Sequence, residues 1–329
     1  MDTTRYRLRE FLDRDFAALV EVEHRLNPEK KQSEEELRHW DAILRTAPMV
    51  YRAFVVEERS TGIGVGFGKL VTDHDTRDPS SLGVDVEVDP DHQHRGIGLC
   101  LSEALLEEAR DRGTRGLWRW VRCDRPRDVA FAERQGFRER RRRWESRLEL
   151  PAPGYASIPD RTETFAREGI EFTTLAKEGP DRVDVRRRLL TLFNAALADE
   201  PRAGSYTPAP YEQFVAMDLE GPGFLPEAFF IARKDDRYIG VSNLSLLPAE
   251  PGTLHQVFTG TLRDYRGRGI ASELKRRTVA YAQEHGFRSI RTSNDSLNRP
   301  MWAINAKLGY HREVEQILFE RSMGPPDPR

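Results

Sequence analysis

The amino-acid sequence predicts a mixed α/β fold built from two tandem copies of one domain. A basic, glycine-rich turn lies between an alternating strand and an amphipathic helix at Gln93 and again, 173 positions later (266 − 93), at Arg266. The same offset relates two later landmarks, Gly113 to Gly286 and Gly136-Phe137 to Gly309-Tyr310. Three landmarks in one register indicate an internal duplication, and a repeat of this length fits a pair of domains better than a solenoid.

The length and the charge balance exclude several classes of protein. A chain of 329 residues can bury two hydrophobic cores. Its 52 basic and 54 acidic side chains leave a net charge of −2, so no overall basic field favours nucleic acid or a membrane surface. The two cysteines form neither a disulfide framework nor a metal cluster, and no apolar run is long enough to span a bilayer. We expect a cytoplasmic protein with no metal, nucleic-acid or membrane partner.

The first copy, residues 1–150, is expected to alternate strands and helices. Ser33 and Glu36 predict a capping box at the start of the second helix. The run Gly62-x-Gly64-x-Gly66-x-Gly68 alternates strictly, which is typical of a glycine-rich strand rather than a nucleotide-binding loop. The expected strands are 4–9, 50–57, 64–72, 84–88, 117–123 and 144–150, and the expected helices are 13–25, 33–44, 97–108 and 128–135.

The second copy, residues 169–329, repeats this order after a linker at 151–168. The linker begins with Pro151-Ala-Pro-Gly, where the hydrophobic periodicity lapses. The expected strands are 172–175, 229–233, 238–246, 254–262, 289–293 and 310–321, and the expected helices are 183–197, 211–217, 270–284 and 300–308. The proline-rich tail from Gly324 is expected to be disordered.

Both turns have the properties of an anion-binding site. Glycine accepts backbone angles that other residues avoid and lets a ligand approach the main chain. The first N–H groups of the following helix and the positive end of its dipole point to one place, so we expect a phosphate or pyrophosphate there. The alternative is an ordinary loop with solvated arginines. The residues are Gln93, His94, Arg95, Gly96, Ile97 and Gly98 in the first copy and Arg266, Gly267, Arg268, Gly269, Ile270 and Ala271 in the second.

These motifs resemble the GNAT family of acyl-CoA-dependent N-acyltransferases, in its tandem two-domain type. The copies match at Gln93-x-x-Gly96-x-Gly98 and Arg266-x-x-Gly269-x-Ala271, each followed by a glycine that ends the helix, a short strand, a second helix and Gly-Phe or Gly-Tyr. The resemblance implies that each domain is a mostly antiparallel mixed sheet flanked by helices, with a central splay that admits the pantetheine arm. It also implies acetyl-CoA or another short acyl-CoA as cofactor, a primary amine of a small molecule as the acceptor, and a monomer, because a tandem pair mimics a dimer.

The resemblance further implies where a general base would lie. In the family a carboxylate often lies eleven positions before the Arg or Gln of the turn, a position held here by Leu82 in the first copy and His255 in the second. Leucine cannot take a proton, whereas histidine titrates near neutrality. The alternative for His255 is a half-buried side chain bonded to a neighbouring strand. His92-x-His94 lacks further metal ligands at a suitable spacing and is expected to be a solvated loop.

Contacts to the cofactor are implied in the same way. The family uses the backbone of the strand before the turn to bind pantetheine, which implies Val86 and Val88 in the first copy and Thr259 and Thr261 in the second. A cofactor-binding Asn and, seven residues later, a Tyr that protonates the thiolate are also typical. Their positions hold Asn298 and Asn305 in the second copy but Arg125 and Ala132 in the first. Asn305 can donate a hydrogen bond to the sulfur but cannot act as an acid. The second copy is therefore the expected catalytic domain, and the first is expected to be degenerate.

Two other interpretations compete with a catalytic N-acetyltransferase. The missing tyrosine in both copies allows a non-catalytic acyl-CoA-binding or scaffold protein. A nucleic-acid-binding module is less favoured, because aromatic stacking motifs are lacking. The irregular segments 26–32 and 198–206 are expected to select the acceptor, and Asp199 and Glu200 could hold a cationic amine or merely be solvated. The sequence does not name that amine.

Overall fold

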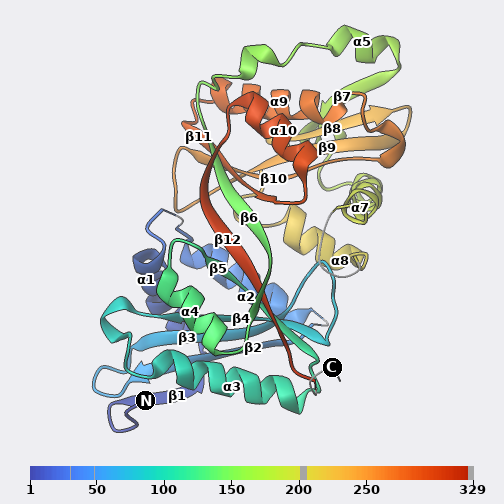
Figure 1. Cartoon of the computed structure of the whole chain (residues 1–329). Coiled ribbons are helices and arrows are strands. Elements are labelled where there is room, and N and C mark those ends of the chain that lie inside the picture. The colour runs from blue at the N-terminus through green and yellow to red at the C-terminus, as the bar shows by residue number, and fades with distance from the viewer. Residues whose placement is uncertain (30, 48, 201–205, 325–329) are drawn as a thin grey trace. The chain divides into compact units, whose positions relative to one another are not determined.

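A computed structural model describes residues 1–29, 31–47, 49–200 and 206–324 (Figure 1). Within these ranges the chain forms two compact units. Unit 1 consists of Met1–Arg141 together with the end of the chain from Ile317, and unit 2 consists of Arg142–Gln316. Each unit holds one of the two glycine turns. From residue 325 the tail that was expected to be disordered lies outside the described residues.

Unit 1 contains a mixed sheet with the strand order β1-β2-β3-β4-β5-β12. Neighbours from β1 to β4 are antiparallel, whereas β4 and β5 are parallel. The parallel pairing joins only Ser81–Gly83 to Gly116–Trp118, and the two strands part beyond it. This splay lies in the middle of the sheet. The strands are β1 (Tyr6–Glu10), β2 (Tyr51–Glu58), β3 (Gly64–Thr72), β4 (Ser81–Val88), β5 (Gly116–Arg122) and β12 (His311–Ser322).

The helices of unit 1 are α1 (Phe16–Leu26), α2 (Glu34–Thr46), α3 (Ile97–Asp111) and α4 (Pro126–Arg134). Both hydrogen bonds of the predicted capping box between Ser33 and Glu36 are present at the start of α2. The predicted glycine-rich strand is confirmed as β3. A Cβ on Gly66 would meet Ile97 at 2.5 Å, and one on Gly68 would meet Leu105 at 3.1 Å. The glycines therefore let α3 pack closely on the sheet.

Unit 2 repeats the arrangement with the strand order β6-β11-β10-β9-β8-β7. Its parallel pair, β10 and β11, joins only Thr253–His255 to Ser289–Arg291. The antiparallel register of β10 with β9 shifts between Gln256 and Phe258, which makes a β-bulge just beyond the parallel pairing. The strands are β6 (Arg138–Glu149), β7 (Ile170–Thr174), β8 (Phe229–Lys234), β9 (Arg237–Leu246), β10 (Thr253–Thr261) and β11 (Ser289–Asp295). A mixed sheet with a central splay in each unit confirms the predicted fold class.

The helices of unit 2 are α5 (Thr162–Arg167), α6 (Leu175–Glu178), α7 (Val183–Leu197), α8 (Tyr211–Phe214), α9 (Ile270–Glu284) and α10 (Arg299–Leu308). A π-helical turn at Val215–Leu219 follows α8. The expected linker contains α5, whose Phe165 is fully buried in the core of unit 2. One-turn 3₁₀ segments occur at Asp13–Asp15 and Pro90–His92 in unit 1 and at Tyr155–Ser157, Pro226–Ala228 and Arg263–Tyr265 in unit 2.

Part of the last strand of each copy lies in the unit of the other copy. Strand β6 ends the first copy, yet it pairs antiparallel with β11 of unit 2, and Leu148 is fully buried beside Leu254 and Ile290. Strand β12 ends the second copy, and from Ile317 it belongs to unit 1, where Ile317 and Phe319 enter the core. The boundaries at 150 and 169 follow the sequence repeat, whereas the compact units follow this exchange of strands. Such pairing depends on residues far apart in the chain, so the repeat alone does not show it.

Candidate active site

His255 lies at the point where the two central strands of unit 2 separate. It is the last residue of β10 that pairs with β11, opposite Arg291. The next residues form the bulge, and Val257 has no partner in the register with β9 and is 41% exposed. In unit 1 the pairing of β4 with β3 runs without a shift, so the bulge distinguishes the two copies.

The partly buried His255 belongs to a row of polar residues across one face of the sheet. Register pairs join Ser245 to His255, His255 to Arg291, and Arg291 to Arg147. The two arginines are paired with carboxylates, Arg291 with Glu250 and Arg147 with Glu313, each at 2.7 Å. Because adjacent residues of a strand face opposite sides, Leu254 packs on the face covered by α9 while His255 lies on the other.

The equivalent position in unit 1 has no titratable group. Leu82 is fully buried and pairs with Leu117 on β5. Arg125, which replaces the cofactor-binding Asn of the family, donates hydrogen bonds to the carbonyl oxygen of Leu26 and to Oδ1 of Asn27 at the end of α1. Ala132, at the position of the acid, is a core residue.

Asn305 and Asn298 have structural contacts in unit 2. Asn305 is 1% exposed, and its Nδ2 donates to Oδ1 of Asn294 at 2.7 Å. Oδ1 of Asn305 is buried and has no hydrogen-bond partner among the described residues. Oδ1 of Asn298 accepts from the backbone N–H of Met301 at 3.3 Å and so caps α10. Roles of these two residues toward a cofactor remain predictions.

Lys275 on α9 is a buried ionisable group that the sequence analysis missed. It is 1% exposed, its Nζ lies 3.4 Å from Oε1 of Gln256, and the same atom lies 5.1 Å from the ring centre of Tyr310. Burial lowers the pKa of Lys275 from 10.5 to about 7. In the sequence, Lys275 lies three residues before Thr278, on the apolar side of the predicted helix. This position could have identified Lys275 as a buried residue.

Replacing Lys275 by methionine is expected to stabilise the fold by about 1–4 kcal/mol near neutral pH, because the dehydrated amine is removed and the volume is kept. In the wild type, the unfolded chain binds one more proton than the folded chain between pH about 7 and 10.5. The free energy of unfolding should therefore rise with pH in that window, by up to about 1.4 kcal/mol per unit. Urea unfolding of both proteins, at neutral pH and about two pH units higher, measures the difference between their free energies of unfolding. A difference in unfolding free energy that is not smaller at the higher pH would contradict this account.

The two glycine turns begin their helices in the same way. Gly96 (φ 79°) and Gly269 (φ 88°) are the N-cap residues of α3 and α9, and their left-handed backbone angles explain the glycines. Neither helix has a side-chain hydrogen bond capping this end in the described chain. The first N–H groups of both helices are thus not capped by side chains and suit an anion. Ile97 and Ile270 point into the cores of their units.

The first residue of each motif anchors the turn to the preceding strand. Nε2 of Gln93 donates to the carbonyl oxygen of Val88, and Nε of Arg266 donates to that of Thr261, both at 3.1 Å. These carbonyl groups are therefore already engaged. The other predicted strand residues, Val86 on β4 and Thr259 on β10, lie beyond the points where the central strands part, and Thr259 Oγ1 is 2.8 Å from Ser242 Oγ.

The remaining residues of the turns differ between the units. In unit 1, Arg95 bonds to Tyr6 Oη and to the carbonyl oxygen of Asp91, and exposed His94 has a φ of 59°. In unit 2, exposed Arg268 lies over the ring of Tyr265 at 5.3 Å. Gly267 has open space around it (φ 74°). Gly98 and Ala271 lie in the first turns of α3 and α9.

The turn of unit 2 gains a further cation from the segment before β7. Nη1 of Arg161 donates to the carbonyl oxygen of Arg268 at 2.5 Å. Asp199, which the sequence suggested for a cationic substrate, instead pairs with Arg263 and, at 3.0 Å, with Arg266. The hydrogen bond from Arg263, with the nearby charge of Arg266, lowers the pKa of Asp199. The rest of the segment expected to select the acceptor includes residues 201–205, which lie outside the described residues.

The described residues contain neither a membrane-spanning helix nor a cluster of metal ligands. No helix among them is both long and apolar enough to cross a membrane. The described His, Cys, Asp and Glu side chains include no group of three or more arranged to hold a metal ion.

Comparisons with known proteins agree with these features. The model of the acetyltransferase (GNAT) family matches residues 8–137 and 191–310. Mycothiol acetyltransferase of Stackebrandtia nassauensis is 27% identical over 276 residues, which is 80% of each chain, and that of Salinispora arenicola is 27% identical over 266 residues, 79% of each. A tandem GNAT protein from the clavulanic acid biosynthesis pathway has the same fold, with a TM-score of 0.73 at 21% identity over 98% of this chain and 100% of that one. A GCN5-related N-acetyltransferase from Sphaerobacter thermophilus has a TM-score of 0.70 at 20% identity, over 98% and 96% of the two chains.

Proposed function

The chain belongs to the acetyltransferase (GNAT) family, an N-acyltransferase family that typically uses acetyl-CoA, and from this we propose that unit 2 transfers acetyl from acetyl-CoA to a primary amine of a small molecule. The observation that carries the proposal is His255 at the mouth of the splay, beside a bulge that unit 1 lacks. The name of the relatives, mycothiol acetyltransferase, supports a small-molecule acceptor.

The cofactor would be held by the turn at residues 266–271. Its pyrophosphate would accept hydrogen bonds from the first N–H groups of α9, and Arg268 would add positive charge. The pantetheine arm would follow the free edge of β10 beyond His255, including the backbone of Thr259 and Thr261. The matching turn of unit 1 at residues 93–98 would bind the same cofactor without supporting turnover, because Leu82 cannot take a proton.

Three groups of unit 2 would carry out the separate steps of direct acetyl transfer. His255 would take a proton from the attacking amine, directly or through a water. Val257 lies in the bulge with no register partner in β9, and its backbone N–H would be the donor to the oxyanion that forms on the carbonyl. Asn305 uses one amide hydrogen on Asn294 and has a second one for the departing sulfur. Because an amide is no acid, the thiolate would collect its proton from solvent.

Release of free thiol from acetyl-CoA in the presence of a panel of small primary amines tests this function. We expect thiol release that depends on both acetyl-CoA and an amine, with the acetylated amine found by mass spectrometry in equal amount. The competing interpretation is a non-catalytic acyl-CoA-binding protein. Tight acetyl-CoA binding, with thiol release no faster than the uncatalysed reaction for every amine tested, would favour that interpretation.

A further inference from the structure

The side chain of Gln256 holds the bulge of β10 in unit 2. Its Nε2 atom donates to the carbonyl oxygen of Asn243 on β9 at 2.8 Å and to that of Phe258 on β10 at 3.1 Å. The register of the two strands shifts between Gln256 and Phe258, so the backbone ladder is interrupted there. One buried amide group therefore bridges β9 and β10 at the interruption.

The backbone of Gln256 is held on the other side of β10 as well. Its carbonyl oxygen accepts a hydrogen bond of 3.2 Å from Oγ1 of Thr292 on β11. The parallel pairing of β10 and β11 ends one residue earlier, at His255 and Arg291. Gln256 is thus tied to both neighbouring strands at the point where the sheet of unit 2 opens.

The other end of the Gln256 amide, Oε1, faces helix α9. Nζ of Lys275 lies 3.4 Å from this oxygen, and Oγ1 of Thr278 lies 3.2 Å from it. Thr278 has one hydroxyl hydrogen, and the carbonyl oxygen of Lys275, at 2.8 Å, is the nearer acceptor for it. Lys275 is therefore the donor that keeps Oε1 turned toward the helix and Nε2 turned toward the bulge.

This lysine is costly to bury. Lys275 is 1% exposed, and no carboxylate of the described chain pairs with it. A methionine of similar volume would avoid the cost of removing an amine from water. Buried ionisable groups of this kind occur preferentially at functional sites, and Lys275 is separated from the bulge by a single side chain.

Unit 1 lacks the corresponding side chains. The offset of 173 residues puts Gly83, which has no side chain, at the position of Gln256. It puts Ser102 at the position of Lys275, and Oγ of Ser102 donates to the carbonyl oxygen of Gly98 within α3. Neither residue of unit 1 can therefore bridge two strands in the way that Gln256 does.

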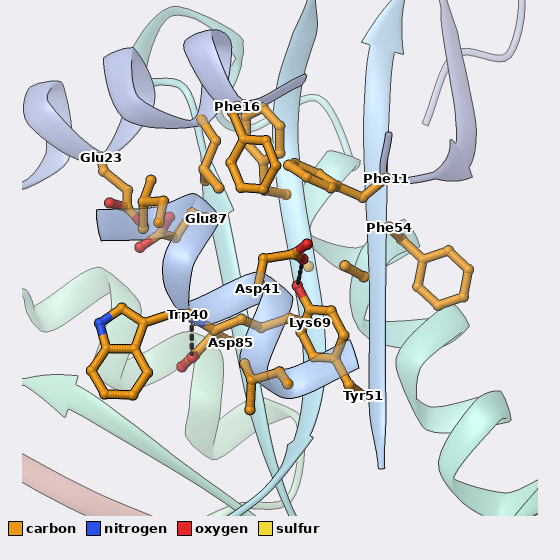
Figure 2. A pocket seen from close by; sticks show the side chains of 16 residues that line it. Phe11, Phe16, Glu23, Trp40, Asp41, Tyr51, Phe54, Lys69, Asp85 and Glu87 are labelled. Carbon is orange, nitrogen blue, oxygen red and sulfur yellow. Dashed lines mark hydrogen bonds and ion pairs between the residues drawn. The ribbon is translucent and has the colours of Figure 1, made fainter. Parts of the chain in front are cut away.

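Unit 1 also lacks the bulge. Strand β4 pairs with β3 without a shift, and Asp85 and Lys69 are register partners in this regular ladder. Figure 2 shows their side chains joined by an ion pair, 3.3 Å long, beside a pocket lined by α1, α2 and the sheet. The bulge and the side chains that hold it thus occur together in unit 2 and are both missing from unit 1.

We propose that Lys275, acting through Gln256, is a positioning residue for acyl transfer, which holds the bulge of β10 so that His255 and Val257 face the acyl group. This inference rests on the proposed function of unit 2 and adds two residues that act through the strand and not on the substrate. Such support affects the rate strongly, because a displacement of about 1 Å at the reacting groups can cost about 100-fold. Lys275 neither gives nor takes a proton in this role.

Replacing Lys275 by methionine tests the proposal, because its two effects should have opposite signs. The variant should be more stable than the wild type, as expected above, and yet its kcat should be about 10- to 100-fold lower. KM for acetyl-CoA should stay within about twofold, because no cofactor contact is removed. Initial rates of thiol release and urea unfolding at neutral pH measure these changes. Lys177→Met, on the exposed side of α6, is the matched control and should keep the wild-type kcat.

The combination with Gln256→Leu tests whether Lys275 acts through Gln256. Gln256→Leu removes the amide and keeps a similar volume, so it should lower kcat at least as much as Lys275→Met does. Adding Lys275→Met to it should then cause no further loss, because residues of one network do not act additively. A double variant whose loss in kcat is the product of the two single losses would overturn the proposal.

Hydrogen exchange of the bulge provides a readout that does not need turnover. In Lys275→Met the amide hydrogens of residues 255–259 should exchange about fivefold faster than in the wild type, while those of residues 82–88 in unit 1 should not change. A wild type without turnover would refute the proposed function, and exchange would still decide whether Lys275 holds the bulge. Unchanged exchange in the bulge overturns the proposal, as does a wild-type kcat in Lys275→Met. A variant that loses stability together with activity also overturns it, because a purely structural role gives that result.

Discussion

Replacing Gly269 by aspartate is expected to weaken acetyl-CoA binding by unit 2 on the order of 100- to 1,000-fold and to remove turnover with it. The new carboxylate would lie at the N-cap of α9. There it can accept hydrogen bonds from the N–H groups that we propose for the pyrophosphate, and its negative charge would repel that anion. Two unit charges about 4 Å apart near a protein surface interact by about 4 kcal/mol, roughly three powers of ten in affinity. Titration calorimetry with acetyl-CoA measures the loss.

The same substitution should leave unit 2 folded. Aspartate is a good N-cap residue and tolerates a positive φ better than most residues. A Cβ at Gly269 (φ 88°) would meet the Nη1 atom of Arg161 at 2.5 Å, which is the movable end of a long side chain.

Gly269→Asn is the matched control, because it has the same shape, the same backbone strain and no charge, so most of the affinity should return. Gly96→Asp makes the equivalent change in unit 1 and should spare turnover. Unchanged acetyl-CoA binding by a folded Gly269→Asp protein would contradict a phosphate site at this turn.

Replacing His255 by alanine is expected to lower turnover about 10²- to 10⁴-fold, the usual cost of losing a general base. Acetyl-CoA affinity should change little, because the predicted cofactor contacts lie in the turn and along β10 beyond this residue. Initial rates across a pH series provide a second readout. The acidic limb that reports a protonated base in the wild type should disappear in the variant.

Leu82→Met is the control for that experiment, since it changes the matching position of unit 1 and conserves its volume. Leu82 is fully buried, so the effect should be confined to stability and should stay below about 1.5 kcal/mol. A fully active His255→Ala protein at every pH, together with an inactive Gly96→Asp protein, would show that unit 1 holds the active site.

Features that depend on neighbours in the sequence were predictable. Helix α7 begins and ends at the expected residues, Val183 and Leu197, because its apolar residues recur at helical spacing. The capping box of α2 joins residues three positions apart. The positive φ of Gly96 and Gly269 follows from the motif, since glycine accepts that backbone angle without strain. The pair of turns, repeated at one fixed offset with the later landmarks, also revealed the duplication before any contact was known.

Other local features were missed because tertiary contacts decide them. The expected linker contains α5, which the buried side chain of Phe165 holds on unit 2. Strand β6 begins at Arg138, six residues before the expected start at Trp144, although five of its first six residues are arginines. Arg142 and Arg143 bond there to Glu315 and Gln316, and these partners are remote in sequence.

By itself, the sequence determined the family, the two copies of the fold and the residues of both cofactor turns. Each of these features depends on patterns of residues that are close together in the chain and on the repetition of those patterns. The tertiary structure alone decided which residues meet across the sheets. It exchanged the last strands of the two copies, aligned His255 with Arg291 and Arg147, and paired Asp199 with Arg266. It also turned Glu23 toward Glu87, 64 positions away (87 − 23), inside a pocket. Strand pairing and helix packing join residues with no fixed separation in the chain, so no periodicity in the sequence encodes these contacts.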